Sequence, residues 1–256
     1  MLTGPDWLAL LPPEMSLPVA VVLVASAALT AALTAGLGIG GGVLLLGIMA
    51  LLVPASALIA THGVVQIGSN VGRTALMWRH VERRLLLPFV LGAVIGAASG
   101  GAIAWQLPEA LLNGALGLFI LYAVWGRWPA MRATGLWLGG SLISFLSMFV
   151  GATGPLVAAL MKTHQLDRLR HMATFSACMS LQHGLKILAF GLFGFQFGPW
   201  WPLLIAMIAS GFAGTWLGER WLRGRAEDGF QRGLNLLLTL MALQLLWQSV
   251  ADLSAR

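Results

Sequence analysis

The sequence predicts an all-α polytopic membrane protein made of two inverted repeats. Hydrophobic residues account for 58% of its 256 residues and charged residues for 9%, whereas a soluble domain has about 25% charged residues. Apolar runs close to the length that a membrane-spanning helix needs recur along the whole chain. A glycine-rich break inside an early apolar run has a counterpart in the second half. Strands of a β-barrel would instead alternate apolar and polar residues over short segments.

Charge and cysteine content narrow the class of protein further. The net charge is +6, but the basic residues lie in short links between apolar runs, which membrane topology explains better than nucleic-acid binding does. The single cysteine, Cys178, excludes an internal disulfide and leaves no pair for dithiol electron transfer. No basic segment precedes the first apolar run, so we expect no cleaved signal peptide. The expected partner is the lipid bilayer, with no nucleic acid and no cofactor.

The first repeat, 17–128, follows a short lead at 1–16. Five glycines within residues 35–42 interrupt its first apolar run. Glycine costs a helix about 1 kcal/mol relative to alanine and permits backbone conformations closed to other residues, so we expect a helical arm on either side of this break. Prolines, which suit the first turn of a helix, mark three further helices. The expected helices are 17–34, 43–53, 55–78, 85–105 and 109–125, with Pro54, Pro88 and Pro108 at or near the starts of the last three.

The second repeat, 129–256, shows the same order of elements. A constant offset of 113 residues aligns the two halves, and the shared order of glycine break, polar helix, small-residue helix and final helix indicates a duplication. The matched pairs include Gly38 with Gly151, Gly41 with Gly154, Asn70 with His183 and Arg73 with Lys186. The expected helices are 133–148, broken at 149–155 and resumed to about 162, then 170–195, 199–220 and 230–248.

Small residues recur at every fourth position in one helix of each half. Small residues at this spacing let helix backbones approach closely, so both series predict tight helix packing. The series are Gly92, Gly96 and Gly100 in the first half, and Ala206, Ser210, Gly214 and Gly218 in the second.

The distribution of positive charge predicts the topology. If 133–163 crossed the membrane once, the twelve basic residues of the links would divide five against seven between the two faces. If this segment enters and returns as a re-entrant hairpin, all twelve lie on one face, the cytoplasmic one, and both termini lie outside. At 17–53 the charges do not distinguish a hairpin from a single broken span, and there the repeat favours a hairpin. One hairpin and three spans in each half would invert the second half relative to the first.

Polar residues at the breaks and inside two helices predict an anion site. Helix N-termini attract anions and bare glycine lets a ligand touch the backbone, although close helix packing without a ligand is the alternative for the breaks. Arg73 and Lys186 are the basic residues placed within helices, and neither has an acidic partner in its span. Charge inside a membrane is costly and usually functional, but Arg73 can also snorkel to the headgroups. The predicted substrate-binding residues are Gly38, Gly40, Gly41, Gly42, Thr61, Gln66, Asn70, Arg73, Gly151, Thr153, Gly154, Thr174, Gln182, His183 and Lys186.

His183 is the candidate for proton coupling, because imidazole ordinarily titrates near neutral pH; a plain interhelical hydrogen bond is the alternative. The other four histidines show no ligand spacing, so we expect no metal site. The glycines at 36–41 match the pattern GxGxxG, but the βαβ setting and the later acidic residue of a dinucleotide site are missing.

The glycine stretch 35–42, the following Pro54 and the helix that carries Ala60 and Thr61 resemble the TauE/SafE family of membrane permeases, named for sulfite export. The half-length repeat, the total length and the second break agree, so the resemblance spans nearly the whole chain. It implies outward transport of small sulfur oxyanions or organosulfonates, and at matching positions it points to the glycines of both breaks. The second break departs from the family pattern, with Thr153 and Pro155 in place of glycines and Asp167 in place of a proline.

We therefore expect a secondary transporter, an exporter of a small anion such as sulfite or an organosulfonate, with alternating access around a midplane site between the breaks. The expected location is the bacterial inner membrane, and we do not expect an enzyme. One alternative is an intramembrane enzyme or a thiol-transfer or redox protein, which would need a cysteine pair, a metal cluster or a nucleophile beside a base. Another is an accessory membrane subunit without transport of its own. A homo-oligomer is compatible with the sequence.

Overall fold

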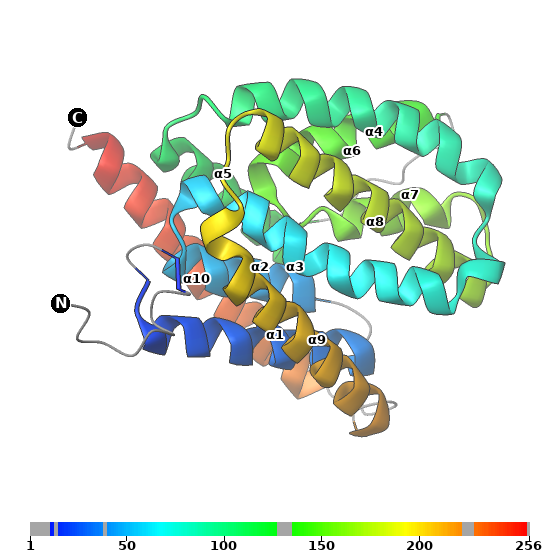
Figure 1. Cartoon of the computed structure of the whole chain (residues 1–256), viewed down its shortest axis with the longest axis horizontal. Helices are drawn as coiled ribbons and strands as arrows, with labels where there is room; N and C mark the ends of the chain where they lie inside the picture. The colour runs from blue at the N-terminus through cyan, green and yellow to red at the C-terminus, as the bar shows by residue number, and fades with distance from the viewer. Residues whose placement is uncertain (1–10, 13–14, 38–39, 127–134, 222–227, 255–256) are drawn as a thin grey trace.

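The computed structural model describes residues 11–12, 15–37, 40–126, 135–221 and 228–254, which are helical except for short links (Figure 1). No strand occurs within these ranges, and the predicted all-α class is confirmed. The helices are α1 (Leu17–Leu37), α2 (Gly41–Leu52), α3 (Ala55–Leu76), α4 (Arg83–Ala104), α5 (Glu109–Trp125), α6 (Leu136–Val150), α7 (Gly154–Lys162), α8 (Arg168–Leu192), α9 (Trp201–Trp221) and α10 (Asp228–Ser254), with 3-10 turns η2 (Trp78–His80) and η3 (Gly198–Trp200).

Every helix expected from the sequence is present. The second break is narrower than expected, because α6 runs to Val150 and α7 already begins at Gly154, with Pro155 in its first turn. Proline lacks the N–H that a first turn would leave unpaired, so it begins this helix and does not prolong the break. Pro54 and Asp167, which the offset of 113 pairs, are the N-caps of α3 and α8. Asp167, which replaces a proline of the family pattern, therefore lies at a helix start as Pro54 does.

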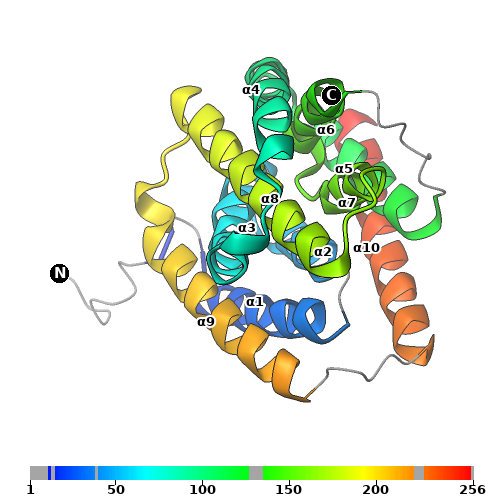
Figure 2. The ribbon, with the colours of Figure 1, turned by 90° about the vertical axis from the view of Figure 1, so that its right-hand side faces the viewer.

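In the described part of the chain, four helical stretches are long and apolar enough to cross a membrane: Leu17–Ala35, Arg83–Ala104, Gly198–Gly218 and Arg232–Ser254. α3 and α8, with 22 and 25 residues, also have the length to span, but they carry more polar side chains. These two helices lie between α1 and α9 on one side and α4 and α6 on the other (Figure 1; Figure 2). The polar helices of this integral membrane protein are thus flanked by its apolar ones.

Small residues bring α4 into close contact with α6, and α1 into close contact with α9. A Cβ atom at Gly96 of α4 would overlap the carbonyl of Ser141 in α6, and one at Gly214 of α9 would overlap the carbonyl of Ala28 in α1. Ser210 of α9 also donates a hydrogen bond across this second contact, to the Val24 carbonyl at 2.8 Å. The tight packing predicted for both small-residue series is confirmed.

Contacts along the helices establish their relative directions. α1, α3 and α9 are parallel, because residue numbers rise together in the contacts of Ala28 with Gly214, Ala32 with Gly218, Gly68 with Ile208 and Gly72 with Phe212. α4, α6 and α8 are parallel in the same way, through Gly92 with Trp137, Gly96 with Ser141, Glu82 with Thr174 and Gly101 with Ala189. α3 and α8 are antiparallel, since Thr74 lies beside Ser180 while Gly63 lies beside Lys186. In each half, the arm before the break and the long helix after it therefore point the same way.

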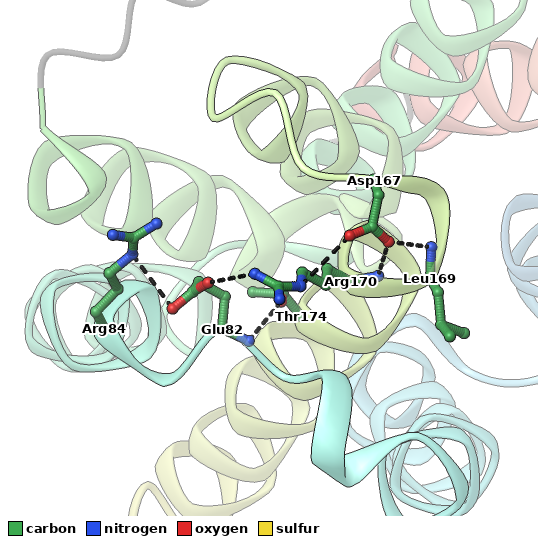
Figure 3. Close-up of polar contacts among 6 residues, drawn as sticks. All are labelled: Glu82, Arg84, Asp167, Leu169, Arg170 and Thr174. Atoms are coloured by element: carbon green, nitrogen blue, oxygen red, sulfur yellow. Dashed lines mark hydrogen bonds and ion pairs between the residues drawn. The ribbon is translucent and has the colours of Figure 1, made fainter.

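The links that precede α4 and α8 meet at one end of the molecule (Figure 3). The Glu82 carboxylate lies 3.2 Å from Arg84 and 3.6 Å from Arg170, and the Glu82 backbone N–H donates to Thr174 Oγ1 at 3.0 Å. A different contact joins the first turns of α3 and α5, where the Ser56 backbone N–H donates to the Glu109 carboxylate at 3.3 Å. Basic links from both halves thus share the Glu82 end.

Candidate functional site

Each break contains a glycine whose backbone lies in the left-handed region. Gly40, the N-cap of α2, has a φ of 96°, and Gly151, the C-cap of α6, has a φ of 73°. Residues with a Cβ atom adopt this conformation only at a cost. Gly41 packs so closely on α1 that a Cβ there would overlap the Thr30 carbonyl. Backbone shape and packing therefore account for these three glycines, while Gly38 lies outside the described residues.

A histidine joins the first break to α3. His62 is fully buried, and its Nε2 forms a hydrogen bond with the carbonyl oxygen of Gly42 at 3.1 Å. The Gln66 amide lies 3.3 Å from the same ring nitrogen, and a Cβ at Gly42 would come within 2.5 Å of that amide. One turn further, the buried Asn70 donates to the Gln66 backbone carbonyl at 2.8 Å. The polar side chains of α3 thus reach the first break near His62.

A lysine joins the second break to α8. Lys186 is 0% exposed, and its Nζ donates to the carbonyl oxygen of Gly151 at 2.7 Å. One turn earlier on α8, the Gln182 side chain accepts from Thr153 Oγ1 at 3.2 Å and donates to Ser144 Oγ at 3.1 Å. The second break is therefore held by two side chains from consecutive turns of α8.

These two connections lie next to each other where α3 crosses α8. The ring centroids of His62 and His183 are 6.2 Å apart with the planes at 72°, and a Cβ at Gly63 would lie 3.2 Å from Lys186 Cδ. Both histidines are buried, and the Nδ1 atom of each lacks a hydrogen-bond partner in the described part of the chain. We call His62, Gln66, Gln182, His183 and Lys186 the central cluster.

Two predicted site residues lie apart from the central cluster, and a third bonds its own helix. Thr174 is about 18 Å from Lys186 along α8 and accepts a hydrogen bond from the link between α3 and α4. Arg73 is about 16 Å from His62 along α3, near the same end of the molecule. Thr61 is buried, but its hydroxyl donates to a backbone carbonyl of its own helix at 2.7 Å, as threonine in helices often does.

The central cluster carries a basic group without an acidic counterpart. Ion pairs among the described residues involve the carboxylates of Glu82 and Asp167, and none involves Lys186. A buried charge is costly unless it is paired, so this arrangement favours an anion that supplies the missing charge. The described residues contain no group of three or more side chains that could hold a metal ion.

The sequence prediction missed two side chains that complete this arrangement, His62 and Ser144. His62 lies four residues before Gln66, so both share one helix face, and that spacing is the signal that could have identified it. Its proximity to His183 depends on how α3 crosses α8. Ser144 of α6 contacts Gln182 of α8, and no local pattern in the sequence predicts a contact between two helices.

A cavity of about 200 Å³ lies beside the link between α4 and α5. Its lining includes Ser56, Ile59, Glu109 and Phe190. Ile59 also abuts the second break, because a Cβ at Gly151 would lie 3.3 Å from Ile59 Cδ1. The Ile59 side chain therefore lies between this cavity and the turn that accepts the hydrogen bond of Lys186.

The sequence profile of one protein family, described as Sulfite exporter TauE/SafE, matches residues 7–245. The matched range includes both breaks, the central cluster and most of α10. No curated protein and no solved structure matches the chain.

Proposed function

The chain belongs to the sulfite exporter TauE/SafE family, and we propose that it is a secondary transporter that exports a small anion such as sulfite or an organosulfonate. The proposed route leads from the cytoplasm through the central cluster to the cavity beside Glu109. The sequence contains no Walker-type phosphate loop, so an ion gradient is the proposed source of energy.

The observation that carries this proposal is the buried Lys186. An ammonium group has three N–H donors, and among the described residues this one has a single hydrogen bond, to the neutral carbonyl of Gly151. An oxyanion beside it would both compensate the charge and accept a charge-assisted hydrogen bond, which is stronger than a neutral one. Thr153 and Gln182, which bond each other one turn away, are further donors at the second break.

The breaks themselves add backbone donors to this site. α2 begins at Gly41 and α7 at Gly154, and the first-turn N–H groups of a helix have no partner within that helix. Such groups bind anions when a ligand can approach them closely. The second break differs chemically from the first through the Thr153 hydroxyl, so we propose that Thr153 contributes to the choice among anions.

Helix directions support two inverted repeats, 17–128 and 129–256, each with a hairpin at its break. Because α1 is parallel to α3, the chain must return through α2 toward the end where α1 began before α3 starts. The same holds for α7, because α6 is parallel to α8. Exchanging the halves maps α1 onto α6 and α4 onto α9, and α1 packs on α9 as α6 packs on α4. The equivalent helices α3 and α8 are antiparallel, as inverted repeats require.

The positions of the links support a topology with both termini outside. The Glu82 end carries basic links from both halves, which the positive-inside rule assigns to the cytoplasm. A rocking movement of one repeat against the other would then expose the central cluster to the two faces in turn.

Flux measurements in proteoliposomes test the proposed function. Efflux of radiolabelled sulfite, sulfoacetate and chloride is followed with and without a pH gradient, and protein-free liposomes serve as the control. We expect sulfite or sulfoacetate to leave faster than from the control. The absence of protein-dependent flux for all three anions would refute the proposal.

A further inference from the structure

Two buried imidazoles with unpaired nitrogens lie beside the proposed anion site. His62 is 0% exposed and His183 is 1% exposed, with ring centroids 6.2 Å apart, and the Nδ1 atom of each has no hydrogen-bond partner in the described structure. Buried polar side-chain atoms are nearly always hydrogen-bonded. Two unpaired nitrogen atoms within one cluster therefore call for an explanation. One explanation is that these nitrogens can accept a proton.

The hydrogen bond of His62 determines where its free lone pair lies. A carbonyl oxygen can only accept, so the 3.1 Å bond to Gly42 needs the ring proton on Nε2. Nδ1 of the same ring then carries an unshared lone pair. His62 can accept a proton at Nδ1 and still hold the first break through Nε2.

The charged group next to this histidine pair is Lys186. The elements around it contribute neutral groups at this level: α2 the Gly42 carbonyl, and the turn between α6 and α7 the Gly151 carbonyl and the Thr153 hydroxyl. Farther away, Arg73 lies near the other end of α3, Glu109 lies in the cavity, and Cys178 of α8 packs in an apolar cluster of α4, α6 and α7. No carboxylate of the described residues forms an ion pair with the central cluster.

We propose that His62 and His183 together take up a proton from the adjacent solution when an anion binds beside Lys186, so that the anion and the proton occupy the site together. This inference rests on the proposed function, because it concerns the same site. An anion lowers the cost of a second positive charge in the cluster, and by linkage the proton must tighten anion binding to the same extent. Two protons would put two charged rings 6.2 Å apart beside an ammonium, so the pair shares one.

Proton uptake on binding tests this inference directly. Full-length protein in detergent and a pH indicator, with little buffer, is mixed with sulfite or with sulfoacetate, which stays ionised near neutral pH; calorimetry gives the Kd. We expect the wild-type protein to take up about one proton per bound anion, and its Kd to fall by up to about tenfold for each unit of decrease in pH.

His62→Gln and His183→Gln are the test variants, because glutamine keeps an amide donor but cannot titrate. Both are expected to bind an anion with less proton uptake than the wild type and with a Kd that depends less on pH. His80→Gln, which removes an exposed histidine of η2, is the matched control and should behave like the wild type. Comparing variants at one pH cancels the protons that sulfite itself exchanges.

The outcomes separate this inference from the function on which it rests. If neither anion binds the wild-type protein, the proposed function is refuted, and the inference that rests on it is refuted as well. If an anion binds but the wild type takes up no more protons than the two variants, only the inference is overturned. Should a variant fail to fold, a wild-type Kd that does not change with pH still overturns the inference, because it excludes a linked proton.

Discussion

The Lys186 ammonium donates a hydrogen bond to the carbonyl oxygen of Gly151 at 2.7 Å, which joins the middle of α8 to the turn between α6 and α7. His62 makes the corresponding contact with Gly42 in the first half. Each break is thus held by a basic side chain from the central helix of its own half. A substrate oxyanion would compete with the Gly151 carbonyl for the lysine, so substrate binding would bias the position of the break.

Lys186→Met should remove anion transport and preserve the fold. Methionine keeps an unbranched side chain that can pack beside Gly63, but it cannot attract an anion. Losing a hydrogen bond to a charged group costs about 1.5–3 kcal/mol, so we expect sulfite efflux from proteoliposomes to fall at least about tenfold. Lys162→Met, which changes the other lysine of the chain at the exposed end of α7, should transport like the wild type. Equal effects of the two substitutions would exclude Lys186 from the site.

Gly151→Ala should destabilise the protein through its backbone. Alanine at a φ of 73° is strained, and its Cβ would lie 2.9 Å from Leu46 Cδ1. Together these effects are worth roughly 1–3 kcal/mol, which should lower the Tm of the detergent-solubilised protein. Gly154→Ala lies in the same break but is helical, and its Cβ would meet nothing closer than 3.7 Å, so its Tm should stay near that of the wild type. An unchanged Tm for Gly151→Ala would mean that the break does not need a left-handed turn.

Local composition made the helices and breaks predictable. Five glycines in eight residues interrupt a helix in any surroundings, and prolines begin helices for reasons that lie within a single turn. The predicted bounds of α5, Glu109–Trp125, are those of the structure. The small-residue series predicted tight packing because spacing alone places such residues on one helix face.

The composition of the central cluster could not be predicted in the same way. The offset of 113 pairs Arg73 with Lys186, but Lys186 belongs to the central cluster, whereas Arg73 lies about 16 Å from His62 along α3. The antiparallel crossing of α3 and α8 brings Lys186 opposite Gly63 and next to His62. Such a crossing is a tertiary property, and equivalent sequence positions do not reveal it.

Asp167 caps α8, and acid should weaken this cap. Its carboxylate accepts hydrogen bonds from the backbone N–H groups of Arg170 and Leu169, both at 3.0 Å (Figure 3). The hydrogen bond from Arg170, then the one from Leu169 and the nearby Arg170 charge, lower the pKa of Asp167 below its ordinary value of 3.8. The resulting stabilisation is fully present above about pH 4 and is lost as the pH falls through the lowered pKa.

Melting curves at several pH values check this prediction. The wild-type Tm should exceed that of Asp167→Ala at neutral pH, and the difference should shrink once the pH falls below about 4. Asp167→Asn keeps a capping oxygen and cannot titrate, so its advantage over Asp167→Ala should not change with pH. A wild-type advantage that persists unchanged in acid would show that the ionised carboxylate is not what stabilises the start of α8.

Cysteine labelling tests whether α6 and α7 form a hairpin. In a Cys178→Ser background, cysteines that replace Arg132 and His164 should react with a membrane-impermeant maleimide from the same face. Arg132 lies before α6 and outside the described residues, and His164 lies in the link after α7. Because α6 is parallel to α8, α7 must return toward the end where α6 began, and both links should therefore be cytoplasmic.

Right-side-out and inverted membrane vesicles distinguish the two faces, and a cysteine at the exposed Gln106, between α4 and α5, marks the opposite one. Labelling of positions 132 and 164 from opposite faces would make 133–163 a single broken span. The basic residues of the links would then divide five against seven, and the case for inverted repeats would be lost. Labelling of both from the cytoplasmic face, with Gln106→Cys reacting outside, would place the second break in a loop that enters from the cytoplasm. By the antiparallel relation of α3 and α8, the first break would then enter from outside, and an anion held between them could be reached from either face in turn.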